Sequence, residues 1–379
     1  MQLTKTLLVV GVGDLAGLVL NLLVQEREFG KMVLAGRNLD EMNRRRNLAL
    51  LFSAQLGRYP RIECVQMDLD NEDQSAQLIS RIQPDVIFNA ATRQSWRIIT
   101  QLPPKAFRQL DEAQFGPWLP MHLSTVYKLM RAVRQSGHDP IVVNAAFPDA
   151  VGPVLRAVNL APTVGIGNVA NMIPALRGAV GLLLEIPLRE VSVALHTQHY
   201  LSHRVPAHGD SAGAPYFAAV EHNGVDVTHE VDFEAAFMLV KTHFQRTAGA
   251  FRQLITASSA VSILSPLLSD TTAMAHAPAP HGLPGGYQVR VAAGEVSVVL
   301  PKDTALEALV GINNDCQRFD GIDRIAPDGT VYFTEKEMQV MKRLLGYECL
   351  RMPLSDIDDR AEELGARYAE FARKAVEFA

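Results

Sequence analysis

The sequence predicts an α/β protein in which a doubly wound parallel sheet is followed by an α+β part with antiparallel strands. Short apolar runs alternate with helical patterns up to about residue 165, which is typical of a parallel sheet. From Arg189 onward, polar and apolar residues alternate as they do in half-buried antiparallel strands. We therefore expect two domains, residues 1–165 and residues 166–379.

A glycine turn near the start of the chain is the strongest functional signal. Residues 7–10 predict a strand, and a helical pattern follows the turn. In a G-x-G-x-x-A turn, the first glycine permits the bend, the second admits a pyrophosphate and the alanine allows close packing, while the helix tip offers N–H groups to the phosphate. The alternative is a glycine turn that has lost its ligand. The predicted nucleotide contacts here are Gly11, Gly13, Asp14, Leu15 and Ala16.

The residues after the second predicted strand indicate which nucleotide binds. An NAD site usually has an acidic residue there to hold the ribose 2′-hydroxyl, but residues 32–35 are followed by Gly36-Arg37-Asn38 and no acid until Asp40. An arginine suits a 2′-phosphate better. We therefore expect NADP in preference to NAD, with Arg37 and Asn38 as contacts. The alternative is that Arg37 is a solvated loop charge.

The later strands of the sheet are predicted from further apolar runs. The fourth ends in small residues, where a cofactor would lie across the switch point of the sheet, so Asn89 and Ala90 are predicted contacts. Residues 93–118 have no regular pattern and are a candidate lid. The predicted strands are residues 62–65, 84–91, 141–144 and 163–168.

In the second half, an Asn223-Gly224 pair marks a hairpin that follows a strand at 190–196. Strands at 287–291, at 296–300 and near Val331 are expected to form one antiparallel set. The predicted helices are residues 232–243, 248–268, 335–345 and 356–378.

Composition limits the cellular setting. The net charge of -5 and pI of about 6.1 provide no basic surface for nucleic acid or an anionic membrane. Cys64, Cys316 and Cys349 are widely spaced and include no C-x-x-C pair, so we expect reduced thiols and not a disulfide framework. No apolar window has the length of a membrane span, and the N-terminal run is broken by glycines. We expect a soluble cytoplasmic protein with a small-molecule substrate.

Several short motifs follow one another in a characteristic order along the chain: Gly11-Val12-Gly13, Ala91-Thr92-Arg93-Gln94, Asn144 with Pro148-Asp149, Gly165-Ile166-Gly167-Asn168 and Thr334-Glu335-Lys336-Glu337. In these motifs and in the order of its elements, the chain resembles the lactate and malate dehydrogenase superfamily. The resemblance implies a Rossmann-type domain followed by a catalytic domain, and a homo-oligomer, either dimer or tetramer. It also places Asn144 near the carboxamide or the substrate, and Arg93 near the pyrophosphate or an anionic substrate group.

Two departures separate this chain from that superfamily. The family carries an aspartate that orients the catalytic histidine, and an arginine three residues later that grips the substrate carboxylate. The helix from Asn168 to Arg177 has neither at that spacing. The family's mobile-loop arginine has no clear match, although Arg97 and Arg108 lie in residues 93–118. We therefore do not expect activity on lactate or malate.

Four histidines lie within thirteen residues, from the last residue of the strand at 190–196 onward: His196, His199, His203 and His208. Transfer of hydride to a carbonyl needs a group of pKa near 7 beside the oxygen, and histidine is the usual choice. The family register favours His199, then His196, while His208-Gly209-Asp210 resembles the family's His-Gly-Asp motif. The alternatives are plain surface histidines, or a metal site at His196, His199 and His203. No carboxylate or cysteine spacing supports a metal, so none is predicted.

The sequence thus favours an NAD(P)-dependent oxidoreductase that acts on a small polar carbonyl, alcohol or imine. Absence of the carboxylate grip points away from simple 2-hydroxy acids. The competing interpretation is a catalytically inactive, dehydrogenase-like scaffold that binds nucleotide as a sensor.

Overall fold

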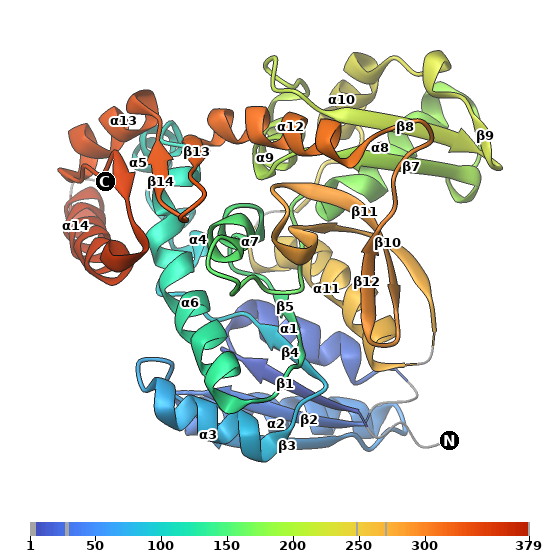
Figure 1. The fold of residues 1–379 in the computed structure, drawn as a ribbon. Coiled ribbons are helices and arrows are strands. Elements are labelled where there is room, and N and C mark those ends of the chain that lie inside the picture. Colours follow the sequence, from blue (N-terminus) through green and yellow to red (C-terminus); the bar gives the residue numbers. More distant parts are fainter. Residues whose placement is uncertain (1–4, 27–29, 248, 270, 378–379) are drawn as a thin grey trace.

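The computed structural model describes residues 5–26, 30–247, 249–269 and 271–377. Its central element is a six-stranded parallel sheet in the order β3-β2-β1-β4-β5-β6 (Figure 1). This is the strand order of a doubly wound dinucleotide-binding sheet, so the predicted fold class is confirmed. The strands are β1 (Thr6–Val10), β2 (Lys31–Gly36), β3 (Arg61–Gln66), β4 (Val86–Asn89), β5 (Ile141–Asn144) and β6 (Val164–Gly165).

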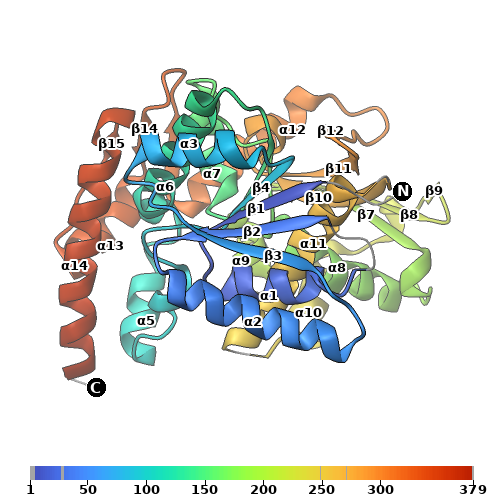
Figure 2. The same ribbon diagram turned by 90° about the horizontal axis from the view of Figure 1, so that it is seen from below.

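Both faces of this sheet are buried by helices. Leu7 and Val9 of β1 pack under α1, α2 and α11, whereas Leu8 and Val10 pack under α3 and α6. Figure 2 shows α1 and α2 on one face of the sheet and α3 on the other. Burial on both sides explains why the strands are continuous apolar runs. These helices are α1 (Asp14–Leu23), α2 (Leu39–Gln55), α3 (Glu72–Ile82), α6 (Leu119–Ser136) and α11 (Leu254–Leu268).

Three smaller antiparallel sheets follow, as expected. The hairpin predicted at Asn223-Gly224 joins β8 to β9 and is confirmed. The strand near Val331 does not join the set of β11 and β12, so that prediction is wrong; it pairs instead with β13 and β15. The three sheets are β7 (Val191–His196) with β8 (Phe217–His222) and β9 (Val225–Asp226); β10 (Ala273–Pro278) with β11 (Gly286–Ala292) and β12 (Glu295–Val298); and β13 (Ile322–Ile325) with β14 (Val331–Phe333) and β15 (Arg351–Met352).

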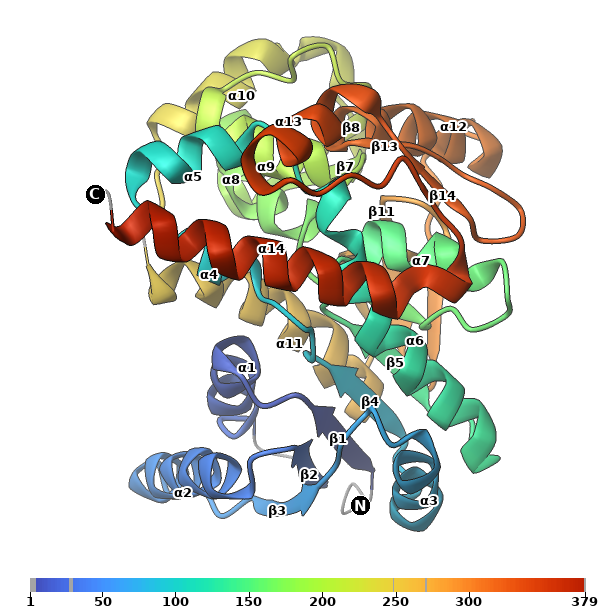
Figure 3. The ribbon, with the colours of Figure 1, turned by 90° about the vertical axis from the view of Figure 1, so that its left-hand side faces the viewer.

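Helices of the second half pack onto elements of the first half. Figure 3 shows α14 running across α6, and Leu364 of α14 shares a core with Leu123 of α6. Ile263 of α11 shares the other core with Leu20 of α1. Both cores include residues from before and after residue 165, and the division into residues 1–165 and 166–379 stays a prediction. The remaining helices of this half are α8 (Val169–Leu183), α9 (His199–His208), α10 (Phe233–Thr242), α12 (Leu306–Gln317), α13 (Glu335–Leu345) and α14 (Ile357–Glu377).

The segment at 93–118, expected to be irregular, is largely helical. It contains α4 (Trp96–Ile99), α5 (Pro104–Asp111) and a short 3-10 turn at Gly116–Trp118. Pro104 begins α5, and Pro117 lies in the first turn of the 3-10 helix. Backbone N–H groups in a first turn have no partner within the helix, so a proline there loses no hydrogen bond and can start a helix. Trp118 is 1% exposed, which anchors the end of the segment in the core.

The outer face of α2 carries large apolar side chains. Met42 faces inward with 2% exposure, whereas Leu48, Leu51 and Phe52 are 61%, 69% and 38% exposed. The helix touches the sheet through Met42, Ala49 and Ser53, so its most apolar side faces outward.

Within the described residues, no helix has the length and apolar character needed to cross a membrane.

Candidate active site

The glycine turn between β1 and α1 leaves an opening over the helix tip. Gly11 has a φ of 82°, and a Cβ atom there would lie 2.6 Å from the Cα atom of Ala91, so only glycine fits. At Gly13 a Cβ atom would have no neighbour within 4 Å. Gly13 caps α1 without a side-chain hydrogen bond, which leaves N–H groups at the helix tip free for a phosphate. This cradle fits the diphosphate of a dinucleotide.

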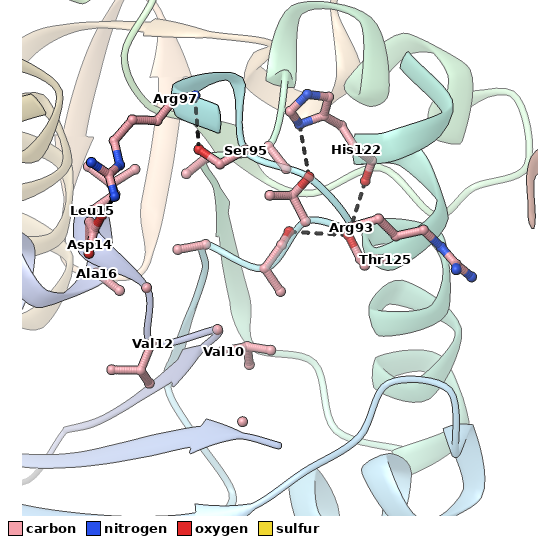
Figure 4. Close-up of a pocket in the computed structure, with 18 of the residues that line it drawn as sticks. Val10, Val12, Asp14, Leu15, Ala16, Arg93, Ser95, Arg97, His122 and Thr125 are labelled. Carbon is pink, nitrogen blue, oxygen red and sulfur yellow. Dashed lines mark hydrogen bonds and ion pairs between the residues drawn. The ribbon is translucent and has the colours of Figure 1, made fainter. Parts of the chain in front are cut away.

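Asp14, the first residue of α1, places a carboxylate between two arginines. Its oxygens lie 3.2 Å from an Nη atom of Arg45 and 2.6 Å from an Nη atom of Arg97, and Figure 4 shows Arg97 reaching toward Asp14. Arg45 also donates to the carbonyl of Gly13 at 3.0 Å. Arg45 lies within the basic run Arg44-Arg45-Arg46, yet its side chain is only 26% exposed and touches the cradle.

A single cavity of about 790 Å³ extends from this turn to His199. Its volume is in the range of roughly 300–1,000 Å³ that ligand pockets usually have. Arg37 lines its rim and is exposed, while Asn38 lines it and also caps α2 by accepting from the N–H of Glu41 at 3.0 Å. The sequence-predicted nucleotide contacts that line the cavity are Gly11, Gly13, Asp14, Leu15, Ala16, Arg37, Asn38 and Ala90.

Asn89 and Asn144 lie behind the cavity wall at the ends of β4 and β5. The Asn89 amide donates to Oδ1 of Asn144 at 2.9 Å, and both side chains are buried. Each also bonds the backbone two residues on: Oδ1 of Asn89 accepts from Ala91 N–H, and Oδ1 of Asn144 accepts from Ala146 N–H. The pair therefore shapes the two turns that line the cavity, and neither side chain lines it.

His199 and Asp320 form a buried pair at the other end of the cavity. Nδ1 of His199 lies 2.9 Å from Oδ2 of Asp320, whose side chain is 3% exposed. Burial disfavours the imidazolium, but the charge and hydrogen bond of Asp320, with further help from Asp149, outweigh it and raise the pKa of His199 above its ordinary value. Asp320 lies in the 3-10 turn before β13, and this turn thus brings a carboxylate to Nδ1 of His199.

A second buried carboxylate, Asp149, lies near this pair. It accepts a hydrogen bond from the amide of Asn168, and burial raises its pKa to about 6, although the charge of His199 opposes that rise. Asp149 belongs to α7 (Pro148–Arg156).

Two neighbours of Asp149 have unusual backbones. Phe147 has a φ of 42° and Asn168 a φ of 51°, and both line the cavity. Left-handed backbone costs of order 1–3 kcal/mol for such residues and clusters at functional sites.

His122, on α6, was not singled out in the sequence and also lines the cavity. Burial lowers its pKa to about 3, so it is neutral, and Nδ1 lies 3.2 Å from the hydroxyl of Thr92. Figure 4 shows His122 and Thr125 across the cavity from Asp14. A neutral imidazole there can donate or accept a hydrogen bond without adding charge.

The other histidines of the cluster do not line the cavity. His196 is fully buried against Phe217 and Tyr287, and burial lowers its pKa to about 4. His203 lies one turn along α9 with its ring 6.2 Å from that of His199, and His208 ends the helix. His199, His203 and His208 belong to α9, whereas His196 ends β7. No group of three or more His, Cys, Asp or Glu among the described residues could hold a metal.

Arg93 lines the cavity, but its guanidinium is engaged elsewhere. It donates to Ser124 at 2.7 Å and to Asp358 at 3.2 Å, and Figure 4 shows it pointing away from the glycine turn. Arg108 is exposed on α5 and does not line the cavity. Arg177 on α8 donates to the carbonyls of Val191 and Leu188.

Sequence reasoning did not identify Asp320, Asp149, Asn168 or His122 as members of one site. Asp320 is 121 residues from His199 and stands in no motif, so only the fold brings them together. Asp149 and Asn168 did give a signal, because both lie in segments that carried the family resemblance.

A doubly wound sheet with an open glycine turn at its switch point, and a histidine–aspartate pair on the same cavity, define a dinucleotide-binding fold of the dehydrogenase type. No protein-family model matches the sequence, and no curated protein sequence matches it.

Solved structures of lactate and malate dehydrogenases do match. A lactate dehydrogenase from Eimeria maxima with NADH and oxamate aligns with a TM-score of 0.55 and 11% identity, over 83% of this chain and 91% of that one. Malate dehydrogenase from Cryptosporidium parvum aligns with a TM-score of 0.54 and 12% identity, over 83% of this chain and 98% of that one. Lactate dehydrogenase from Cryptosporidium parvum, with lactic acid and nicotinamide adenine dinucleotide, aligns with a TM-score of 0.53 and 15% identity, over 84% of this chain and 99% of that one. The chain therefore has the lactate/malate dehydrogenase fold, which confirms the resemblance at the level of fold.

Proposed function

We propose that this protein is an NAD(P)-dependent oxidoreductase that transfers hydride between nicotinamide and a carbonyl, alcohol or imine substrate. The observation that carries the proposal is the single cavity that joins the glycine turn to the His199–Asp320 pair. Binding of a dinucleotide alone would not require a buried histidine with a raised pKa at the far end of the cavity.

The residues at the cradle end would hold the coenzyme. Gly13 and the tip of α1 receive the diphosphate, Ala90 faces the cavity at the end of β4, and Arg37 stands at the rim. The bound nicotinamide supplies or accepts the hydride. Residues 1–165 thus form the proposed coenzyme part, and residues 166–379 the part that provides His199.

At the other end, His199 moves the proton. In the reductive direction its imidazolium donates to the substrate oxygen or nitrogen, and in the oxidative direction the neutral ring accepts that proton. Asp320 fixes the ring through Nδ1, which leaves Nε2 as the nitrogen available to the substrate. Asp320 also stabilises the charged ring, so His199 stays protonated to a higher pH than a free histidine.

The coenzyme preference remains part of the proposal. Arg37 at the rim of the cavity, with no acidic residue beside it until Asp40, supports NADP. Several of the similar dehydrogenase structures were solved with NADH or nicotinamide adenine dinucleotide, which favours NAD as the alternative.

Three predicted site residues take different roles in this proposal. Arg93 and Asn144 support the wall of the cavity and do not contact the substrate directly, because Arg93 is paired with Asp358 and Asn144 with Asn89. His196 is left out as acid or base, because Phe217 and Tyr287 enclose it away from the cavity.

We also propose a homo-oligomer in the cytoplasm. The exposed apolar side of α2, with Leu48, Leu51 and Phe52, supports an interface between copies of the chain. The three cysteines are free thiols, which supports a reducing compartment.

The test is loss of absorbance at 340 nm when NADPH or NADH is mixed with panels of ketones and imines, together with calorimetry of the same coenzymes. Coenzyme binding with turnover of at least one substrate supports the proposal. Coenzyme binding without turnover across both panels would favour the inactive sensor.

A further inference from the structure

Aromatic rings wall the His199 end of the cavity. The ring of Phe115 lies 4.6 Å from that of His199 and 4.4 Å from that of Phe147, between centroids. Phe147 lies 5.6 Å from His199, and His122 lies 5.1 Å from Phe115. All four side chains line the cavity. A flat apolar group placed beside His199 would therefore meet ring faces and edges.

No arginine or lysine is free to hold an anion at this end, among the described residues that line the cavity. Its arginines are Arg37, Arg93 and Arg97. Arg97 is paired with Asp14 at the glycine turn, Arg93 with Asp358, and Arg37 follows β2 at the coenzyme rim. The pKa of His122 is lowered to about 3 by burial, so its ring is uncharged at neutral pH.

The charges that do surround His199 are negative. Asp320 pairs with it directly, and the charges of Asp149 and Asp111 also act on it. A substrate carboxylate beside His199 would meet these carboxylates, and the imidazolium of His199 is already paired with Asp320.

Phe147 shows that the aromatic wall is built at a cost. Its φ of 42° is a conformation that a residue with a bulky side chain rarely adopts. The residue is nevertheless held firmly, because its carbonyl accepts the hydrogen bonds that begin α7 and the residue is only 3% exposed. Backbone outliers of this kind cluster at functional sites, where the surrounding structure holds them in place.

We propose that the substrate is a ketone, or the corresponding alcohol, with no carboxylate beside the reacting carbon and with an aromatic or similarly flat apolar group that packs against Phe115 and Phe147. This inference rests on the oxidoreductase function proposed above. The carbonyl carbon gains the hydride of the reduced nicotinamide and the carbonyl oxygen gains the proton of His199, so the ketone becomes an alcohol while the coenzyme is oxidised.

The test compares phenylacetone with phenylpyruvate, which share a benzyl ketone and differ in a methyl group against a carboxylate. Binding of each is measured by calorimetry without coenzyme and with oxidised coenzyme, and kcat/KM is measured with reduced coenzyme. We expect phenylacetone to bind at least tenfold more tightly and to be reduced at least tenfold more efficiently. Phe115→Ala should reduce phenylacetone affinity at least tenfold, while the matched variant Phe233→Ala, in a separate aromatic cluster with Tyr216 and Phe237, should not.

Preference for phenylpyruvate, or equal binding of both ketones, would overturn this inference and leave the oxidoreductase proposal intact. Failure of both ketones to bind, in protein that does bind coenzyme, would also overturn it. If no coenzyme binds, the oxidoreductase proposal fails. Calorimetry without coenzyme then still shows whether the His199 end of the cavity binds phenylacetone more tightly than phenylpyruvate, as inferred.

Discussion

The two ends of the cavity are built in different ways. The coenzyme end comes mainly from one continuous stretch, since β1, the glycine turn, α1 and β2 follow one another within residues 6–36. The histidine end is assembled from α6, α7, α9 and the turn before β13, which lie far apart in the sequence. A glycine turn is thus a local structure that a sequence motif can specify, whereas the His199–Asp320 pair depends on the whole fold.

The largest effect should come from removing the proposed acid. His199→Asn should lower kcat by roughly 100- to 10,000-fold, because no other described side chain on the cavity combines a raised pKa with a free ring nitrogen. Coenzyme affinity, measured by calorimetry, should change little if the two ends are independent. The matched control is His203→Asn, one turn along the same helix and off the cavity. Equal rates in both variants would remove His199 from the mechanism.

Asp320→Asn should have the next largest effect. Without this carboxylate, burial dominates and the pKa of His199 falls, so the imidazolium is lost at lower pH. Reductive kcat/KM, which needs the protonated ring, should drop by roughly 10- to 100-fold at pH 7.5 and recover in part as the pH is lowered. The control is Asp323→Asn, on the surface beside Arg318. A pH profile that keeps its position in Asp320→Asn would show that the pair does not set the ionisation of His199.

Much of the coenzyme end could be predicted from the sequence, and little of the histidine end. Gly11, Gly13 and Arg37 were identified because their spacing after two apolar runs has few physical explanations. Asp320 could not be identified, since its role depends on how the chain returns to α9 after 121 residues. Arg45 could not be identified either, because a run of three arginines on a helix usually faces water, and only the position of α2 beside the turn brings Arg45 to Gly13.

Arg37→Ala tests the coenzyme end alone. If the guanidinium meets a 2′-phosphate, NADPH affinity should fall about tenfold while NADH affinity stays the same. Calorimetry with both coenzymes measures this, and Arg46→Ala, on α2 but off the cavity, is the control. Equal NADPH binding in wild type and Arg37→Ala would leave Arg37 as a solvated charge.

The smallest expected effect is at Asp14. Its carboxylate sits beside the phosphate cradle and is neutralised by Arg45 and Arg97. Asp14→Asn removes the charge that opposes a diphosphate and frees both arginines, so coenzyme affinity should rise about three- to tenfold. The rise should shrink at high salt because the ion pairs are partly exposed. Weaker binding in this variant would mean that Asp14 is needed to position the arginines.

The most direct test of the central claim is calorimetric titration of the wild-type protein with NADPH, NADH, NADP and NAD. We predict saturable binding of at least one of the four, with one site per chain, and loss of that binding in Gly13→Glu, which fills the open side of the cradle. No heat with any of the four coenzymes, or undiminished binding in Gly13→Glu, would contradict the claim that the glycine turn holds a nicotinamide dinucleotide against His199.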